Sequence, residues 1–333
     1  MMKIGYLGLG AWGYCLANML ASKGFAVTAW TVEPNVARAL RETRRHPVFP
    51  DIEASAHLTV TTELEEALHG ADIIVESVTS AGVRSVFTEM KALREVSVPI
   101  IFTSKGIEQG SGLILEDVVA EVLGEEYRNL LGCISGPSYA VEVIRGLPTS
   151  VVGSAYDVNV MKTVCEIFQT PTFRIYPNSD IRGVAFGGAL KNIIAIACGI
   201  GAGLQLGQSS QAALMTRGLH EMCKLAVAGG CRAETLSGLS GMGDLCVTCS
   251  STKSRNFRFG NLIASGLSSE AAKEEIGMVV EGAYTCVSAL QLSQRLNVSM
   301  PITECVYRVI YEGMSPQDAV VALMSRAVKE EHL

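Results

Sequence analysis

Charged and aromatic residues are scarce in this chain of 333 residues, and the scarcity limits the classes of protein to which it can belong. Only 18% of the residues are charged and 6% aromatic, whereas 48% are hydrophobic. A disordered chain has the opposite balance, so we expect a globular protein, long enough for two domains with a core each. The formal net charge of −6 argues against nucleic acid as the main partner, although it leaves room for a local basic pocket.

The chain also lacks the usual signals for secretion or membrane insertion. Its N-terminus, MMKIGYLGLG, passes directly into a strand-like pattern without the regions of a signal peptide, so we expect a cytoplasmic protein. Only the apolar run at 183–206 is long enough to span a bilayer. Its single charge, Lys191, would cost about 2.5–3.5 kcal/mol at the centre of a membrane helix. We therefore interpret this run as a buried helix of a protein that is not membrane-embedded.

Disulfides and metal sites are not expected either. Most of the ten cysteines lie in apolar segments, which is typical of reduced thiols packed in a core. Cys246 and Cys249 form a CxxC pair, but no second CxxC or CxxH pair completes a zinc set. We therefore expect no metal.

The first thirty residues have the pattern of a dinucleotide-binding βαβ unit. An apolar strand at 3–7 precedes Gly8-Leu-Gly10-Ala11-Trp12-Gly13, a helical pattern follows, and a second strand is predicted at 27–30. In such a turn the first glycine permits the tight bend, the second admits the pyrophosphate, and the third lets helix and strand pack closely. We therefore expect the turn to bind NAD or NADP, and we favour this over a chance glycine-rich turn.

The residues after the second strand leave the choice between NAD and NADP open. Glu33 lies where an acidic residue hydrogen-bonds the ribose 2′-hydroxyl of NAD. Four arginines follow, at 38, 41, 44 and 45. They could accommodate a 2′-phosphate or simply be solvated charges.

Strands and helices alternate up to residue 180. Further strands are predicted at 58–60, 71–78 and 98–106, with helices through 86–96 and 112–123 and a capping box formed by Thr62 and Glu65. Two strands, TSVVGS and TFRIYP, with a helix between them, complete the pattern. We therefore predict an α/β fold, with a Rossmann-like doubly wound domain over 1–181.

Two sites in this domain are candidates for binding an anion. Lys105 ends the strand at 98–106, and ligands of open α/β sheets lie at the carboxyl ends of the strands. Gly136 and Ser138 precede a helix, where a backbone N–H and a hydroxyl can meet an anion. An ordinary surface lysine and a simple N-cap are the alternatives.

Helices alone are predicted for the rest of the chain, so we expect an all-α domain over 182–333. They span 183–203, 211–229, 254–266, 269–276, 282–296, 301–311 and 315–330.

Desolvation disfavours the charged form of Lys191, which suits it to proton transfer. A polar loop is predicted at 237–260. In it, Asp244 could orient a lysine or cap a turn, and Ser254-Arg255-Asn256 could seat a phosphate.

Nine short motifs recur in one family in this order and spacing. They are GLGAWG at 8–13, TSKG at 103–106, ISGPSYAVE at 134–142, GGALKNIIAI at 187–196, TRGLHEM at 216–222, GMGDLCVTC at 241–249, SRNFRFG at 254–260, VVEG at 279–282 and MPIT at 300–303. The chain therefore resembles the bacterial-type NAD(P)-dependent glycerol-3-phosphate dehydrogenases over nearly its whole length.

This resemblance implies an enzyme that reduces dihydroxyacetone phosphate to sn-glycerol 3-phosphate, or the reverse, and that supplies phospholipid synthesis in the cytoplasm as a homodimer. Cofactor contacts are implied for Trp12, Lys105, Ala140, Arg255, Val279 and Glu281. Substrate contacts are implied for Lys105, Gly136, Ser138, Lys191, Asp244, Ser254, Arg255 and Asn256. Lys191 matches the family's proton acceptor, Asp244 or Asn192 could hold its amine, and Lys105 would assist.

Two departures from the family pattern are visible. Ala202 stands where the family carries an acidic residue, and Ser209 where it carries asparagine. The segment after the second strand also lacks an arginine or histidine common in bacterial members. The alternatives are a β-hydroxyacid dehydrogenase of the 6-phosphogluconate type, whose asparagine four residues after the lysine is here Ala195, and a non-catalytic NAD(P)-binding sensor.

Overall fold

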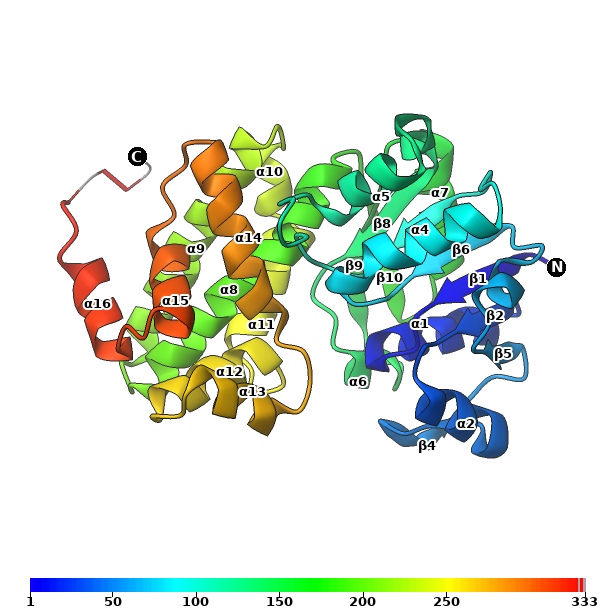
Figure 1. The fold of residues 1–333 in the computed structure, drawn as a ribbon, viewed down its shortest axis with the longest axis horizontal. Helices are drawn as coiled ribbons and strands as arrows, with labels where there is room; N and C mark the ends of the chain where they lie inside the picture. The colour runs from blue at the N-terminus through cyan, green and yellow to red at the C-terminus, as the bar shows by residue number, and fades with distance from the viewer. Residues whose placement is uncertain (329, 332–333) are drawn as a thin grey trace. The chain divides into compact units, whose positions relative to one another are not determined.

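The computed structural model describes residues 1–328, 330 and 331 (Figure 1). The chain forms two compact units. The first combines Met1–Lys105 with Leu115–Ile181, and the second combines Gly106–Ile114 with the chain from Arg182 onward. The segment at 106–114 thus packs with the second unit although it lies within the first half of the sequence.

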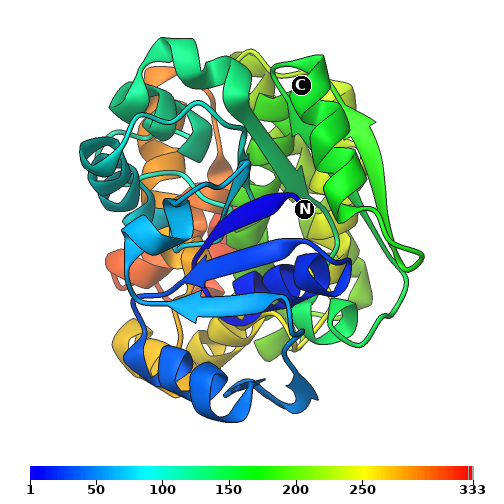
Figure 2. The ribbon, with the colours of Figure 1, turned by 90° about the vertical axis from the view of Figure 1, so that its right-hand side faces the viewer.

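An eight-stranded sheet forms the centre of the first unit (Figure 2). Its strands, in spatial order, are β10 (Phe173–Asn178), β9 (Thr149–Ala155), β8 (Leu131–Ser135), β7 (Ile100–Phe102), β6 (Ile73–Glu76), β1 (Lys3–Leu7), β2 (Ala26–Trp30) and β5 (Leu58–Thr61). All neighbours are parallel except β8 and β9. Strand β1 pairs with both β2 and β6, so the winding reverses beside β1, where ligands of doubly wound sheets bind.

Helices and one small hairpin surround this sheet. The helices are α1 (Ala11–Ser22), α2 (Pro34–Thr43), α3 (Leu64–Leu68), α4 (Val83–Leu93), α5 (Leu115–Leu123), α6 (Ala140–Val143) and α7 (Val158–Phe168). The hairpin pairs β3 (Arg45–His46) with β4 (Phe49–Glu53). The Rossmann-like fold predicted from the alternating pattern is confirmed.

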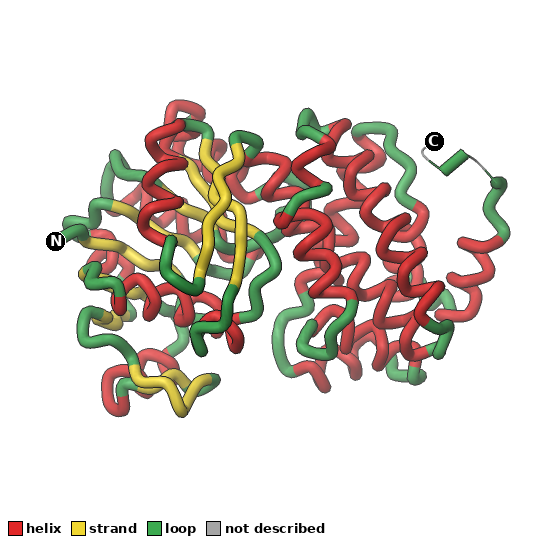
Figure 3. Tube along the Cα trace, turned by 180° about the vertical axis from the view of Figure 1, so that it is seen from behind, coloured by secondary structure: helices red, strands yellow, loops and turns green. Residues whose placement is uncertain are grey.

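The second unit is helical, as predicted (Figure 3). Its helices are α8 (Ile181–Gly203), α9 (Gln208–Ala228), α10 (Ala233–Leu236), α11 (Asp244–Cys249), α12 (Arg255–Ala264), α13 (Ser269–Ile276), α14 (Glu281–Arg295), α15 (Pro301–Tyr311) and α16 (Pro316–Met324). Helix α8 is apolar on all sides, and such helices lie inside a core. By length and composition α8 could cross a membrane, but 94% of its apolar window is buried inside the protein.

Glycines let α8 and α12 approach closely. A Cβ added to Gly199 would lie 2.0 Å from the Phe257 carbonyl oxygen, and one added to Gly260 would lie 2.1 Å from that of Ile196. These are backbone atoms, so no side chain can move aside. The low helix propensity of glycine is therefore outweighed here by helix–helix packing, which brings residues on α8 and α12 together.

Two local predictions were wrong, and one element was not predicted. The helix after β5 begins at Leu64 with Glu63 as its N-cap, and no capping box forms between Thr62 and Glu65. Instead Thr61 accepts a hydrogen bond from the Glu63 N–H (3.0 Å) and donates one to Glu66 (2.5 Å). The segment at 237–260 is not a continuous loop, because it contains a π-helical turn, Leu239–Gly243, followed by α11. The hairpin at 45–53 was not predicted at all.

Several helix and strand ends also differ from the predicted ones. Helix α5 begins three residues later than predicted, since 112–114 pack with the second unit. Helix α16 ends at Met324 rather than at 330, and residue 329 lies outside the described residues. Strands β6 and β7 are shorter than the apolar runs that predicted them.

Candidate active site

The glycine-rich turn after β1 has the stereochemistry that a dinucleotide site requires. Gly8 has φ +99°, and a Cβ there would lie 2.7 Å from the Ser77 carbonyl oxygen. A Cβ on Gly13 would lie 2.1 Å from the Gly8 carbonyl oxygen. Around Gly10, by contrast, a Cβ would meet no described atom within 4 Å. The first and third glycines are thus required by the fold, whereas the second leaves open space for a ligand.

The first turn of α1 faces the same open space. Gly10 is the N-cap of α1, and no side chain caps the helix. Its first N–H groups, from Ala11 onward, therefore remain available to an anion. The indole Nε1 of Trp12 is buried and has no hydrogen-bond partner among the described residues. These residues fit the pyrophosphate of a dinucleotide.

Hydroxyl groups and one carboxylate join the ends of β1, β6 and β7. The Tyr6 hydroxyl lies 2.6 Å from Ser77 Oγ, which in turn contacts Thr103 Oγ1. Burial raises the pKa of Tyr6, so its hydroxyl stays protonated. The fully buried Glu76 accepts hydrogen bonds from the Val78 N–H (2.7 Å) and from Ser104 Oγ (2.5 Å). Both loops that follow β6 and β7 are thereby fixed.

Lys105 follows this fixed loop and reaches the next strand. Its Nζ donates a hydrogen bond to the Gly136 carbonyl oxygen (3.3 Å), and Ser138 Oγ donates to the same oxygen (3.1 Å). Gly136 packs against Val151, whose Cα would lie 2.9 Å from an added Cβ. Ala140 begins α6 one residue after the N-cap, Tyr139. The structure thus brings together Lys105, Gly136 and Ser138, the anion-site candidates of this unit.

The segment after β2 contains the predicted acidic residue and the arginines. Glu33 is exposed and is the N-cap of α2. Three of the arginines donate to backbone carbonyl groups: Arg41 to Val60 (3.1 Å), Arg44 to Ala54 (2.9 Å) and Arg45 to Pro50 (2.8 Å). Arg38 donates to Asn35 Oδ1 (2.9 Å). These arginines therefore hold α2 and the hairpin in place.

In the helical unit, Lys191 lies buried in α8 and is bound by α11. Its Nζ donates a hydrogen bond to Asp244 Oδ1 and another to Thr248 Oγ1 (2.8 Å). The exposed fractions are 8% for Lys191 and 1% for Asp244. A buried ammonium is tolerated only beside an opposite charge and hydrogen-bond acceptors. Of the two partners considered from the sequence, Asp244 makes the contact.

Asn192 has a different role from the one considered. Asn256 Nδ2 donates to Asn192 Oδ1 (3.0 Å), and Asn256 Oδ1 accepts from the Gly282 N–H (2.9 Å). Both asparagine side chains are buried. They connect α8, α12 and the N-terminus of α14, so Asn256 holds the scaffold that surrounds Lys191.

Arg255 links the starts of α12 and α14. Its Nη1 donates to the Val279 carbonyl oxygen (2.9 Å). Burial lowers the pKa of the Arg255 guanidinium and the Glu281 carboxylate raises it, so the two side chains are electrostatic neighbours. Ser254 is the N-cap of α12, with Oγ accepting from the Phe257 N–H (3.2 Å). The predicted positions 255, 279 and 281 therefore form one cluster.

Comparison with known proteins shows to which family this chain belongs. The model for the N-terminal part of NAD-dependent glycerol-3-phosphate dehydrogenase matches residues 3–161, and that for the C-terminal part matches 180–321. The chain belongs to the NAD-dependent glycerol-3-phosphate dehydrogenase family. This confirms the family that the motifs predicted, and supports it over the two alternatives.

Related proteins of this dehydrogenase family match over 98% or more of their lengths. A glycerol-3-phosphate dehydrogenase [NAD(P)+] of Protochlamydia amoebophila is 64% identical over 100% of both chains, and that of Chlamydia pneumoniae is 54% identical over 99% of both. The crystal structure of a glycerol-3-phosphate dehydrogenase from Coxiella burnetii has a TM-score of 0.91 at 37% identity, and covers 98% of each chain.

The first departure from the dehydrogenase pattern, at Ala202 and Ser209, lies at the end of α8 and the start of α9. Ala202 is half-buried and packs against the helical core, and Ser209 is exposed in the first turn of α9. Neither of them takes part in the hydrogen bonds that the Lys191 amine donates to Asp244 and Thr248. Thr248, which does, was missed by sequence reasoning, although it lies within the family motif GMGDLCVTC.

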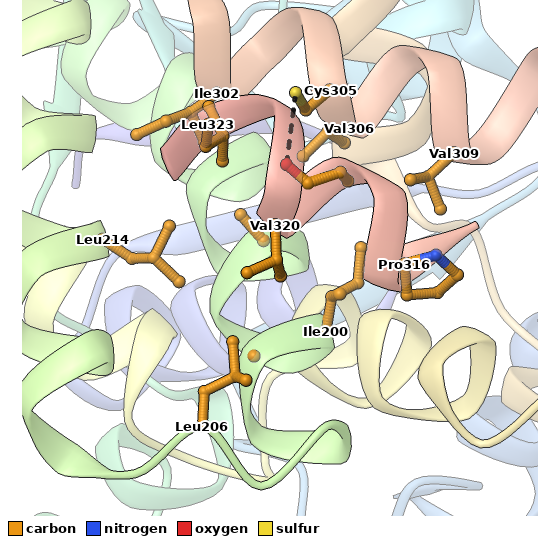
Figure 4. Close-up of a pocket in the computed structure, with 13 residues that line it drawn as sticks. Ile200, Leu206, Leu214, Ile302, Cys305, Val306, Val309, Pro316, Val320 and Leu323 are labelled. Atoms are coloured by element: carbon orange, nitrogen blue, oxygen red, sulfur yellow. Dashed lines mark hydrogen bonds between the residues drawn. The ribbon is translucent and has the colours of Figure 1, made fainter. Parts of the chain in front are cut away.

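A cavity in the helical unit is unrelated to this chemistry. It lies among α8, α9, α15 and α16 and is lined by apolar groups such as Ile200, Leu206 and Val320 (Figure 4). Its one sulfur-bearing residue, Cys305, directs Sγ to the Ala319 carbonyl oxygen at 3.9 Å. No charged or hydroxyl side chain lines it among the described residues, so it offers no catalytic group.

Proposed function

We propose that the protein interconverts dihydroxyacetone phosphate and sn-glycerol 3-phosphate with a nicotinamide cofactor. The observation that carries this proposal is the buried Lys191, held by Asp244 and Thr248 in a chain of this dehydrogenase family. The glycine turn in the other unit supports it, because its open side at Gly10 suits a dinucleotide.

The proton chemistry follows from the environment of Lys191. A nicotinamide cofactor bound at the glycine turn would supply a hydride to the central carbon of the substrate, and the carbonyl oxygen would then need a proton. Lys191 donates that proton from Nζ, and accepts it in the oxidation direction. Asp244 and Thr248 fix the direction of Nζ, and the positive charge stabilises the developing alkoxide. Lys105 is the second cation that we assign to this reaction.

The phosphate group is assigned to the start of α12. Arg255 offers a guanidinium beside the N-terminal N–H groups of that helix, a combination that suits a phosphate dianion. Binding energy from this distant group would orient the reacting carbon. Asn256, already engaged by Asn192 and Gly282, supports the site indirectly.

We further infer that NAD(H) is preferred over NADP(H). The exposed carboxylate of Glu33, at the N-cap of α2 in the segment after β2, suits a ribose 2′-hydroxyl and repels a 2′-phosphate. Arg41, Arg44 and Arg45 are engaged with backbone carbonyl groups. Replacing Glu33 by Ser should therefore raise kcat/KM with NADPH and leave that with NADH equal or lower. If wild type used NADPH better than NADH, this preference would be wrong.

A homodimer in the cytoplasm that supplies lipid synthesis is the physiological setting we propose, as the family resemblance implies. Light scattering after size-exclusion chromatography tests the dimer, and a mass of about one chain would exclude it.

The function itself is tested by mixing the protein with dihydroxyacetone phosphate and either NADH or NADPH. Consumption of neither cofactor would refute the proposed function.

A further inference from the structure

His46 lies between the glycine-rich turn and the β3–β4 hairpin. It is 2% exposed. Its Nε2 lies 2.9 Å from the Leu9 carbonyl oxygen, within the turn Gly8-Leu9-Gly10, and its Nδ1 lies 3.1 Å from the Val48 backbone nitrogen. The imidazole therefore connects the turn to a hairpin that sequence reasoning did not predict.

These two contacts determine the tautomer of His46. The Val48 N–H can only donate, so Nδ1 must accept and carries no proton. The Leu9 carbonyl can only accept, so Nε2 must carry the proton and donate it. Burial lowers the pKa of His46, although the Leu9 hydrogen bond raises it, which favours the neutral ring that both contacts require.

Aromatic packing keeps the ring in this position. The Tyr14 ring, on α1, stacks on His46 with centroids 4.8 Å apart and planes inclined by 20°. Phe49, on β4, lies 6.0 Å from the imidazole on the hairpin side. Because α1 and β4 supply these rings, the direction of Nε2 is fixed by the helix that follows the turn and by the hairpin.

The orientation of the Leu9 carbonyl sets that of the next amide. In a trans peptide the C=O and the following N–H point in opposite directions. Since the Leu9 carbonyl points toward His46, the Gly10 N–H points away from it. A Cβ added to Gly10 would meet nothing within 4 Å, so this part of the turn has room for a ligand.

We propose that His46 is a positioning residue for the nicotinamide dinucleotide: through the Leu9 carbonyl it directs the Gly10 N–H toward the cofactor pyrophosphate. The inference rests on the proposed use of that cofactor. It concerns neither the substrate nor proton transfer, so it predicts a loss of cofactor affinity without a loss of kcat at saturating cofactor.

Three substitutions separate the contacts of His46. His46→Gln places an amide nitrogen near the position of Nε2 and can still donate to Leu9. His46→Asn places an oxygen near the position of Nδ1 and keeps only the Val48 contact, whereas His46→Phe keeps the stacking and loses both hydrogen bonds. His57→Gln is the matched control, because His57 is an exposed histidine of the same unit.

The test is isothermal titration calorimetry with NADH, together with steady-state kinetics and the melting temperature of each variant. We expect the Kd for NADH to rise about tenfold or more in the Asn and Phe variants, and less than about threefold in the Gln variant. The KM for the cofactor should rise in parallel, while kcat and the KM for dihydroxyacetone phosphate stay near their wild-type values.

Each other outcome contradicts a specific step. If wild type bound NADH and all three His46 variants bound it equally well, the positioning role would be refuted while the proposed function stood. If affinity fell equally in all three and followed their melting temperatures, His46 would be only structural. If wild type itself did not bind NADH, the proposed function would fail and this inference with it.

Discussion

Replacing Glu221 by Gln should change how the stability of the protein depends on pH. Glu221, on α9, is 4% exposed and caps α15 by accepting from the Ile302 N–H (2.6 Å), the Thr303 N–H (3.2 Å) and Thr303 Oγ1 (3.3 Å). Burial raises the pKa of its carboxyl from 4.5 to about 7, and the hydrogen bonds from Ile302 and Thr303 only partly oppose this.

The sign and size of the effect follow from this raised pKa. Between pH 4.5 and about 7 the folded protein holds a proton on Glu221 that the unfolded chain has lost. The stability supplied by this proton is therefore complete below pH 4.5 and disappears as pH rises through about 7. A shift from 4.5 to about 7 corresponds to about 3 kcal/mol at 1.36 kcal/mol per pKa unit.

Urea unfolding of the wild type and of Glu221→Gln from pH 4.5 to 8 measures this effect. The free energy of unfolding of the wild type, minus that of the variant, should fall by about 3 kcal/mol across the range. The subtraction removes the exposed carboxylates, which are common to both proteins. A constant difference, or one that grows as pH rises, would refute the reasoning.

Three further predictions concern the site. Asp244→Asn should lower kcat more than about a hundredfold in assays at pH 7, because Lys191 loses its buried counter-charge; a kcat within threefold of wild type would contradict this. Arg255→Ala should raise the KM for dihydroxyacetone phosphate about tenfold or more, with a smaller effect on kcat. The control variant Arg258→Ala, at an exposed neighbouring arginine, should not raise this KM. Equal KM values for the two variants would refute the phosphate assignment. Gly10→Val should abolish NADH binding in calorimetry and leave the melting temperature unchanged. Gly8→Val should lower both the NADH affinity and the melting temperature, because it forces a side chain into φ +99° and onto the Ser77 carbonyl. A Gly10→Val variant that binds NADH normally would show that the open space is not the ligand site.

The fold could be predicted well where local pattern and tertiary packing agree. Strand β1, the glycine turn and α1 form one contiguous signal, and α8 is a single apolar run. Prediction failed where packing overrides composition. The glycines and serines at 237–260 indicate a loop, but burial of Leu245 and Cys249 stabilises α11. The β3–β4 hairpin has only two residues in its first strand, too few for a periodic signal.

The sequence allowed more of the site residues to be predicted than of the contacts between them. Lys191 stood out as a lone charge in an apolar run, but its partner Asp244 lies 53 residues away, and only the fold decides between Asp244 and Asn192. Glu76 gives the same signal within the apolar strand IIVE and was missed. Glu221 lies in the motif TRGLHEM and caps a helix that begins in the motif MPIT, so the presence of both motifs could have indicated a contact between them.

The central claim is that Lys191 transfers the proton in a nicotinamide-dependent reduction of dihydroxyacetone phosphate. The most direct test is the rate of NADH oxidation by wild type and by Lys191→Ala at saturating substrate, with NADH binding of both measured by calorimetry. We expect wild type to turn over, and the variant to bind NADH with unchanged affinity while its kcat falls by about a thousandfold or more. A variant with near-normal kcat, or a wild type that oxidises neither NADH nor NADPH, would contradict the account.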